Sequence, residues 1–229
     1  LEFRRVLFRS EGDRHHALRM LHALKHRFGA THELGLFEMG ESGLADVPDP
    51  SALFLADRRA GSPGSIVAPV LEGARPLLVE VQALVSSTTA PMPRRSAQGL
   101  ESSRLAMLLA VLDARAGLPL VDVDVYTSVA GGVRVAEAGA DLAVALAVAG
   151  ARLGVAVPDD LVAVGEIGLG GELRQAGQTP RRLAEAARLG FTRAIVPAST
   201  PDVDGITLLR VGSVVEALHA AGLRGTEPA

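Results

Sequence analysis

The stretch "VDVDVYTSVAGGV" at residues 121–133, followed by "AEAGADLAVALAVAGARLG" at residues 136–154, decides the fold. In the first part Val121, Val123 and Val125 alternate with aspartates, which is typical of a strand with one buried face. The second part is apolar around nearly the whole helical circumference, so it predicts a helix buried on nearly every side. A strand followed by such a helix indicates an α/β arrangement.

The flanking sequence continues this alternation. Strand-like runs at 65–73 and 76–85 predict a hairpin, and residues 100–117 predict a helix that ends at Gly117. Two short strands around a glycine cluster are expected within 161–175, and a helix at 179–190 with Thr179 as its cap. Strands at 191–199 and 205–212 and a last helix at 213–222 follow. We therefore predict helices on one or both faces of a mixed sheet.

The first part of the chain is different in character. Leu18, Leu21, Leu24 and Phe28 recur at helical spacing and predict a helix over 13–28. Residues 32–40 suggest a strand pair, and residues 50–55 a short helix capped by Asp49. The segment "AGSPGS" at 60–65 reads as a linker and a domain boundary, and residues 86–99 as a polar loop.

Composition excludes several classes of function. The 229 residues include no cysteine, so disulfides, thiolate zinc sites and cysteine nucleophiles are excluded. No apolar run reaches the roughly 18 residues of a membrane span. We expect a cytoplasmic protein without a membrane partner. Because the net charge is −3, nucleic-acid binding would require a local basic patch.

The only lysine, Lys25, stands in "KHRFG" at residues 25–29, two positions before Arg27. On an extended segment these two cations project to the same side, and a phosphate between them would relieve their repulsion. The alternative interpretation is a solvated end of a basic helix.

Residues 11–44, "EGDRHHALRMLHALKHRFGATHELGLFEMGESGL", resemble a stretch of the bacterial RadA (Sms) DNA-repair family, whose signature "KNRFG" is matched except at His26. The runs "GSIVAPVLEGARPLLVEVQALV", "DVYTSVAGGVRVAEAGADLAVALAVA" and "VGEIGLGGELRQ" resemble that family's Lon-protease-like domain, in the same order. The resemblance covers residues 11–220.

The resemblance implies an α/β (α+β) fold, in which a Lon-protease-like domain (ribosomal protein S5 domain 2-like) follows a truncated tail of a RecA-like ATPase core. The expected limits are a non-family leader or artefact at 1–10, the core remnant at 11–62, the Lon-like domain at 64–222 and a tail at 223–229. It also implies that Lys25, Arg27, Phe28 and Gly29 contact the nucleotide of a neighbouring subunit.

Cofactors and partners follow from the same resemblance. ATP and Mg belong to the full-length parent, and zinc to an N-terminal finger that these residues lack, so none is expected in this fragment. The implied partners are single-stranded or branched DNA, further copies in a homo-hexamer and a recombinase. The implied activity is that of an ATP-dependent motor for branch migration, and the fragment alone would be inactive.

Peptidase chemistry is expected to be absent. Lon proteases use a Ser–Lys dyad, and the serine's place falls near Gly139 and Ala140, the lysine's near Pro180 and Arg181. Arginine stays protonated and cannot act as the base. We therefore predict no catalytic residue in this chain. Two alternatives stay open: a Ser–Lys peptidase, and a ring-assembly module without DNA binding.

Arginines of the second domain are the candidates for DNA contact. Phosphate contacts from them would give salt-sensitive, sequence-independent binding, and ordinary surface ion pairs are the alternative. The predicted DNA-binding residues are Arg94, Arg95, Arg104, Arg134 and Arg174, with Arg181 and Arg182 nearby in sequence.

Three further patterns receive ordinary interpretations. The segment "GLGGE" at 168–172 lacks the spacing of a dinucleotide loop and predicts a hairpin turn. Ser128 has aspartates nearby in sequence but no histidine, which disfavours a triad. The histidines at 15, 16, 22 and 26 are expected to be solvated or to face DNA, so no metal site is predicted.

Overall fold

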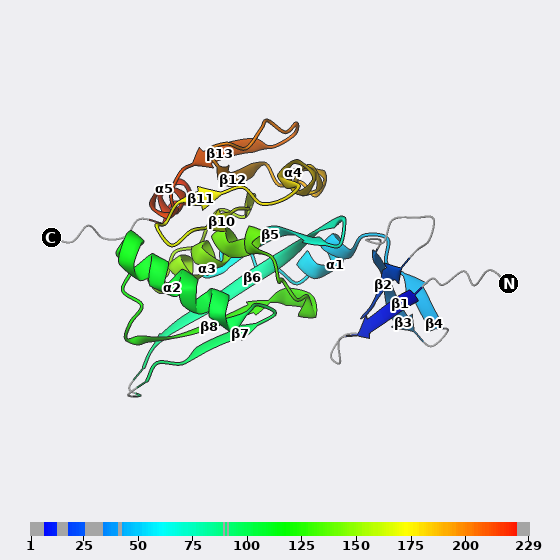
Figure 1. Cartoon of the computed structure of the whole chain (residues 1–229), viewed down its shortest axis with the longest axis horizontal. Coiled ribbons are helices and arrows are strands. Elements are labelled where there is room, and N and C mark those ends of the chain that lie inside the picture. The colour runs from blue at the N-terminus through cyan, green and yellow to red at the C-terminus, as the bar shows by residue number, and fades with distance from the viewer. Residues whose placement is uncertain are drawn as a thin grey trace.

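A computed structural model describes residues 7–12, 18–25, 34–40, 43–88, 90 and 92–223. A small four-stranded sheet stands to one side of a larger body built on a seven-stranded sheet (Figure 1). Within the described residues, no helix combines the length and apolar character required to cross a membrane.

The larger sheet is mixed, as the alternation of strands and helices predicts. Its order is β13-β12-β9-β5-β6-β8-β7, and only the β5–β6 and β6–β8 pairs are antiparallel. The predicted hairpin of β5 and β6 is confirmed. Its strands are β5 (Ser65–Glu72), β6 (Arg75–Ser87), β7 (Arg95–Gln98), β8 (Val123–Val129), β9 (Leu161–Ala163), β12 (Arg193–Pro197) and β13 (Thr207–Val211).

Strand β7 corrects the prediction of a polar loop over 86–99. Its residues are too polar to show an apolar period, yet they pair in parallel with β8 from Arg95 to Gln98. The strand is fixed by backbone hydrogen bonding to its neighbour, which sequence periodicity does not report.

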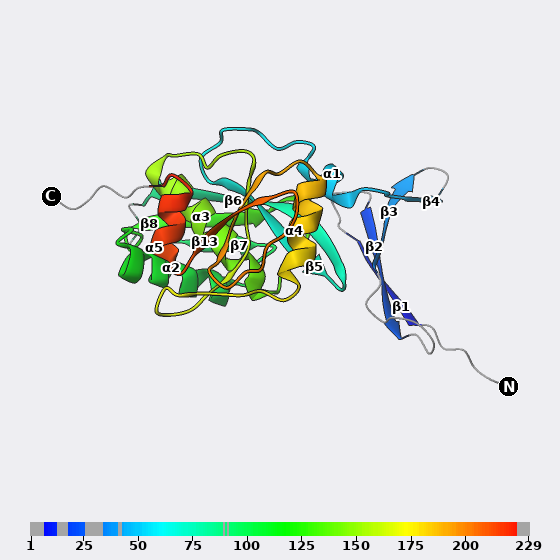
Figure 2. The ribbon, with the colours of Figure 1, turned by 90° about the horizontal axis from the view of Figure 1, so that it is seen from above.

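Helices cover both faces of this sheet (Figures 1 and 2). One face packs against α2 (Ser102–Ala116), α3 (Asp141–Leu153) and α5 (Val214–Ala220). The other packs against α4 (Thr179–Arg188), where Leu183 and Ala186 meet Val67 and Val162. This α/β architecture confirms the predicted fold class.

Helix α3 is the centre of the core. Every residue from Asp141 to Gly150 is buried, as the apolar run predicts. Helix α2 ends at Gly117, whose φ of 64° is the left-handed conformation that glycine adopts without steric cost.

The start of α4 differs from the prediction. Thr179 does not cap it; the preceding residue Gln178 does, in a left-handed conformation with φ 54°. Thr179 Oγ1 instead donates to the carbonyl of Ala176 at 2.7 Å. The hydroxyl finds a backbone acceptor in the preceding turn, which competes with capping.

The small sheet is an antiparallel meander of β1 (Leu7–Gly12), β2 (Leu18–Lys25), β3 (Leu34–Gly40) and β4 (Gly43–Asp46). The strand pair expected within 32–40 is wrong in its limits, because residues 34–40 of this stretch form the single strand β3 and its hairpin partner β4 follows at 43–46. The helix predicted over 13–28 is wrong, because β2 occupies 18–25 between β1 and β3. Hydrogen bonding on both edges outweighs the helical spacing of the leucines.

The connection between the sheets contains α1 (Pro50–Leu55), which Asp49 caps through a 3.0 Å hydrogen bond, as predicted. Ser51 Oγ accepts a 3.1 Å hydrogen bond from the Leu78 amide of β6. Further on, Asp159 accepts hydrogen bonds from the Gly61 amide at 3.0 Å and, through its carbonyl, from Arg58 at 2.9 Å. The expected linker is therefore fastened to the body, and the exact domain limits stay a prediction.

Candidate functional site

The place expected for a peptidase serine lies in the 3-10 turn Ala138–Ala140, just before α3. Gly139 is buried there, and a Cβ added to it would lie 3.3 Å from Nη1 and 3.4 Å from Cζ of Arg182. Arg181, the residue expected in the lysine's position, is exposed and donates to Gln178 at 2.9 Å. The side chain that faces Gly139 is thus Arg182.

Arg182 is completely buried, and each of its three side-chain nitrogens donates at least one hydrogen bond. Its Nε donates to the Gly177 carbonyl at 2.8 Å, and its Nη1 to the Pro69 carbonyl at 2.9 Å. Both terminal nitrogens also donate to the carboxylate of Glu137, in the two-pronged arrangement that suits a guanidinium. Arginine does not release its proton, so this centre can hold elements together but cannot deprotonate a serine.

Glu137 extends the same network to the sheet. Its Oε1 accepts a 2.8 Å hydrogen bond from the Leu71 amide in addition to the contact with Arg182. One ion pair therefore fastens α4, β5 and the segment before α3 to each other.

A second ion pair joins Arg104, a half-buried residue at the start of α2, to the buried Asp141 at the start of α3. Arg104 Nε donates to Oδ1 at 2.8 Å, Nη2 donates to Oδ2, and the Ile167 amide donates to Oδ2 at 3.0 Å. Burial raises the pKa of Asp141 against the opposing effect of Arg104, and the hydrogen bond to Asp141 raises the pKa of Arg104. Arg104, a predicted DNA contact, thus also serves the packing of α2 on α3.

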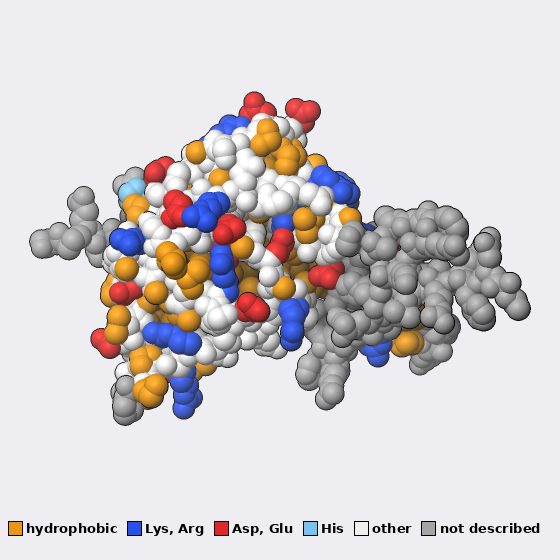
Figure 3. Space-filling model, in the orientation of Figure 1, with side chains coloured by type: hydrophobic (Ala, Val, Ile, Leu, Met, Phe, Trp, Pro, Cys, Tyr) orange, Lys and Arg blue, Asp and Glu red, His pale blue; other side chains and the backbone are white. Residues whose placement is uncertain are grey.

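The other candidate arginines differ in whether internal contacts hold their guanidinium groups. Arg95 donates to the carbonyls of Leu120, at 2.6 Å, and of Val123. Arg174 pairs with Glu172 at 2.6 Å, on an exposed surface. Arg94 and Arg134 are exposed, and within the described residues neither guanidinium has an ion-pair partner. In the view of Figure 3, blue side chains are scattered among red ones.

The segment around the lysine is described only in part. Lys25 is the last residue of β2, opposite Leu7 of β1. Arg27, Phe28 and Gly29 lie outside the described residues. Their contact with a neighbouring subunit's nucleotide stays a prediction.

Of the lesser motifs, the predicted hairpin turn at 168–172 is confirmed, and the interpretation of the histidines stays a prediction. The turn at 168–172 joins the two-stranded sheet β10 (Glu166–Ile167) and β11 (Leu173–Arg174), with Gly171 at φ 84°. His219, on α5, lies on the face of the sheet opposite to Ser128. In the described part of the chain, no group of three metal-binding side chains is found; the histidines at 15, 16 and 26 fall outside it.

Sequence reasoning missed two features. The Arg182–Glu137 pair joins residues 45 positions apart, which no local pattern indicates. Glu80, in contrast, interrupts the apolar run of β6 and is still only 4% exposed. A charged residue inside such a run could have been recognised as a signal of a buried polar site.

Fold and site together define a mixed α/β domain in which an arginine–glutamate pair lies beside Gly139, preceded by a small antiparallel sheet. No protein-family model matches the chain.

The chain is similar to several proteins that share one name with each other. It is 46% identical over 216 residues to "DNA repair protein RadA" of Bacillus subtilis, covering 92% of this chain and 47% of that protein. It is 50% identical over 189 residues to the protein of that name from Escherichia coli, covering 82% and 41%. The chain belongs to the RadA family and spans less than half the length of these relatives.

Proposed function

We propose that this chain acts in DNA repair, as one part of an ATP-dependent motor that moves the branch points of recombination intermediates. The name and the high identity of its relatives support this role. In this proposal ATP and Mg bind to the complete protein, which works in the cytoplasm as a homo-hexamer on single-stranded or branched DNA and meets a recombinase. The Lon-like domain is its scaffold for assembly and DNA contact.

The observation that favours DNA contact is the state of Arg94 and Arg134. Both guanidinium groups are exposed and have no ion-pair partner within the described residues, so a phosphate would not have to displace an internal partner. Arg95, by contrast, is held by backbone carbonyls.

The test is a salt titration of binding to single-stranded DNA, read by fluorescence anisotropy. Arg94→Ala and Arg134→Ala should each weaken binding and make the slope of log K against log salt shallower, by about 0.7 for each phosphate of a single strand that the arginine had neutralised. Arg181→Ala is the control, because this exposed arginine already binds Gln178. Unchanged slopes in both variants would contradict a DNA role for these residues.

The motor role is tested separately in the full-length protein. Lys25→Ala and Arg27→Ala should abolish DNA-stimulated ATP hydrolysis in the assembled ring and leave DNA binding by this part intact. If ATPase activity and branch migration survive both changes, the proposed contact with the neighbour's nucleotide is wrong.

A second candidate function is assembly without DNA contact. It is favoured by the engagement of Arg95 and Arg104 in internal contacts. Light scattering that shows oligomers, together with no DNA binding at low salt, would select it. Peptidase activity is disfavoured because Arg182 fills the space beside Gly139.

A further inference from the structure

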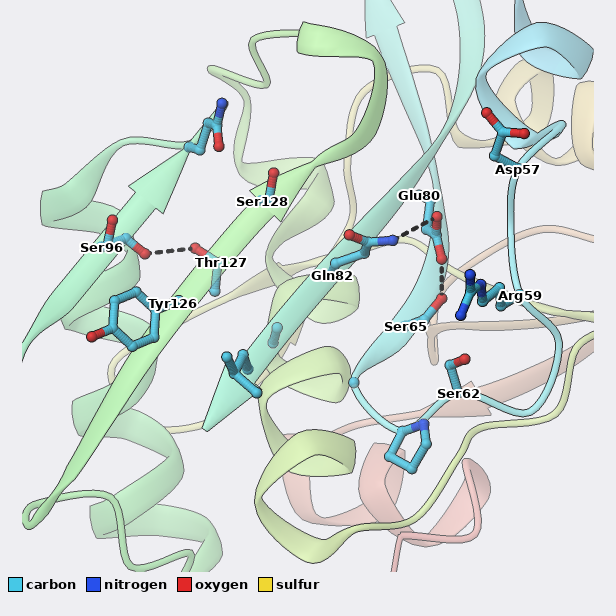
Figure 4. Close-up of a pocket in the computed structure, with 15 residues that line it drawn as sticks. Asp57, Arg59, Ser62, Ser65, Glu80, Gln82, Ser96, Tyr126, Thr127 and Ser128 are labelled. Carbon is cyan, nitrogen blue, oxygen red and sulfur yellow. Dashed lines mark hydrogen bonds between the residues drawn. The ribbon is translucent and has the colours of Figure 1, made fainter. Parts of the chain in front are cut away.

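A hollow of about 450 Å³ lies on the same face of the large sheet as α4, over strands that this helix does not cover (Figure 4). Its floor is formed by β6, β8 and β7, which meet in register: Gln82 stands opposite Ser128 and Leu84 opposite Tyr126, while Ser128 also pairs with Gln98. The loop that ends at Gly64 forms a wall. The size is within the range of ligand-binding pockets.

The buried carboxylate of Glu80 is the unusual group in this hollow. Ser65 donates its hydroxyl proton to Oε1, and Gln82 Nε2 donates to Oε2 at 3.0 Å. Within the described residues no cation lies at ion-pair distance from it, although Glu80 is only 4% exposed. A buried charge normally has an ionic partner, because desolvation penalises it.

Arg59 is the nearest candidate for that partner, but it does not make the contact. It extends from the loop toward Ser65 and Glu80 (Figure 4), is exposed, and forms no ion pair within the described residues. A neighbouring hollow of about 360 Å³ shares Asp57 and Glu80 and adds Glu38 and Arg58, and the guanidinium of Arg58 is already paired with Asp159. Acidic groups therefore outnumber free basic ones around Glu80.

The lining excludes two classes of ligand. A phosphate or carboxylate ligand would meet the uncompensated charge of Glu80 at close range. A purely apolar ligand would leave the hydroxyls and amides of the floor without partners. A neutral polar ligand would satisfy the floor but leave Glu80 without a counter-ion, so a cation fits the lining best. The side chain of Leu84, 61% exposed, offers contact for an aliphatic stem, and the ring of Tyr126 offers a cation–π contact.

We propose that this hollow binds an organic cation, a guanidinium or ammonium group on an aliphatic chain, with Glu80 as its counter-ion. Arg59, which lines the same hollow, competes with the ligand for Glu80. The site is separate from the arginines to which DNA contact is assigned, so this proposal does not depend on the proposed function.

Calorimetric titration of the purified chain tests the site with N-acetylarginine amide, and with N-acetylcitrulline amide as a neutral probe of the same shape. The arginine probe should bind at least about tenfold more tightly than the citrulline probe. Spermidine forms a second arm. Binding of spermidine alone identifies a free polyamine as the source of the cation, and binding of the arginine probe alone identifies a basic side chain of a polypeptide. Failure of both overturns the proposal.

Two variants should change the affinity for the cation in opposite directions. Glu80→Gln keeps the shape and an acceptor for Ser65, and should weaken binding of the cation about tenfold or more. Arg59→Ala removes the competing cation and should strengthen it, whereas an anion site would show weaker binding. Asp204→Asn, an exposed acid outside the hollow, is the control. Equal binding of both amide probes overturns the proposal, and so does weaker cation binding by Arg59→Ala. If Glu80→Gln does not fold, the Arg59→Ala variant still tests whether the site prefers a cation.

Discussion

At the scale of residues, two partly buried ion pairs, Arg182–Glu137 and Arg104–Asp141, join elements of this domain that are far apart in sequence. Arg182 has a side chain with only 1% exposure and satisfies its nitrogens on Glu137 and two backbone carbonyls. Replacing Arg182 would leave the half-buried carboxylate of Glu137 without its cation and those two backbone carbonyls without their donor. It would also empty the space of a fully buried side chain.

Arg182→Ala is therefore expected to lower the free energy of unfolding by about 3–5 kcal/mol. Urea denaturation followed by circular dichroism measures it. Arg181→Ala, at the exposed neighbouring position, should change the value by about 0.5 kcal/mol or less. Equal effects of the two substitutions would contradict the structural role of Arg182.

Asp160 is expected to make the stability of the folded protein depend on pH. Hydrogen bonds from Arg193, with Nε at 2.8 Å, and from Thr192 hold the pKa of this carboxyl well below its usual range. A depressed folded-state pKa contributes stability that is complete above the unfolded value of about 3.9 and is lost as the pH falls toward the folded value.

Asp160→Asn should thus lower the melting temperature at neutral pH, by an amount that corresponds to about 0.5–1 kcal/mol for a pair this exposed. The difference from the parent should shrink steadily below a pH of about 4. Differential scanning calorimetry across this range checks it. A constant difference at every pH would show that the ion pair is not the cause.

At the scale of elements, tertiary pairing decides what local pattern leaves open. The leucines of β2 are spaced for a helix and still form a strand, because β1 and β3 hydrogen-bond to both its edges.

Helix α1 packs against the body through a close contact between Phe54 and a glycine. Phe54 lies against Gly131, and a Cβ there would come within 2.3 Å of the ring.

Gly131→Ala should therefore cost about 2 kcal/mol or more, since it combines a left-handed φ of 74° with a collision against the ring of Phe54. Gly117→Ala is the matched control: its φ is 64°, and a Cβ there meets nothing within 4 Å. Its cost should be about 1 kcal/mol. If urea denaturation gives the same destabilisation for both, the contact with Phe54 does not hold α1.

At the scale of the whole molecule, the connection between the sheets is fixed to the body. Asp159 binds the Gly61 amide and Arg58, and the Arg58 guanidinium lies 6.0 Å from the centre of the Phe191 ring. This tether converts a proline- and glycine-containing segment into a defined path between the two sheets.

Asp159→Ala should release that segment and leave the core intact. Limited trypsin digestion should then cut after Arg58 or Arg59 faster, on the order of a few-fold, with little change in melting temperature. Asp202→Ala, which removes an exposed partner of Arg210, serves as the control. Unchanged cleavage would show that Asp159 does not restrain the connection.

Local patterns in the sequence were enough to predict the mixed α/β class, the buried helix α3, the β5–β6 hairpin and the ending of α2 at Gly117, because periodicity, apolar runs and glycine report local requirements directly. Its motifs also indicated the family. The folded chain was needed to show that β2 is a strand and that Arg182 rather than Arg181 faces Gly139. It was also needed to show that Glu80 is buried with no cation at ion-pair distance among the described residues. These three features depend on contacts between residues that are far apart in the chain, and such contacts produce no periodic pattern in the sequence.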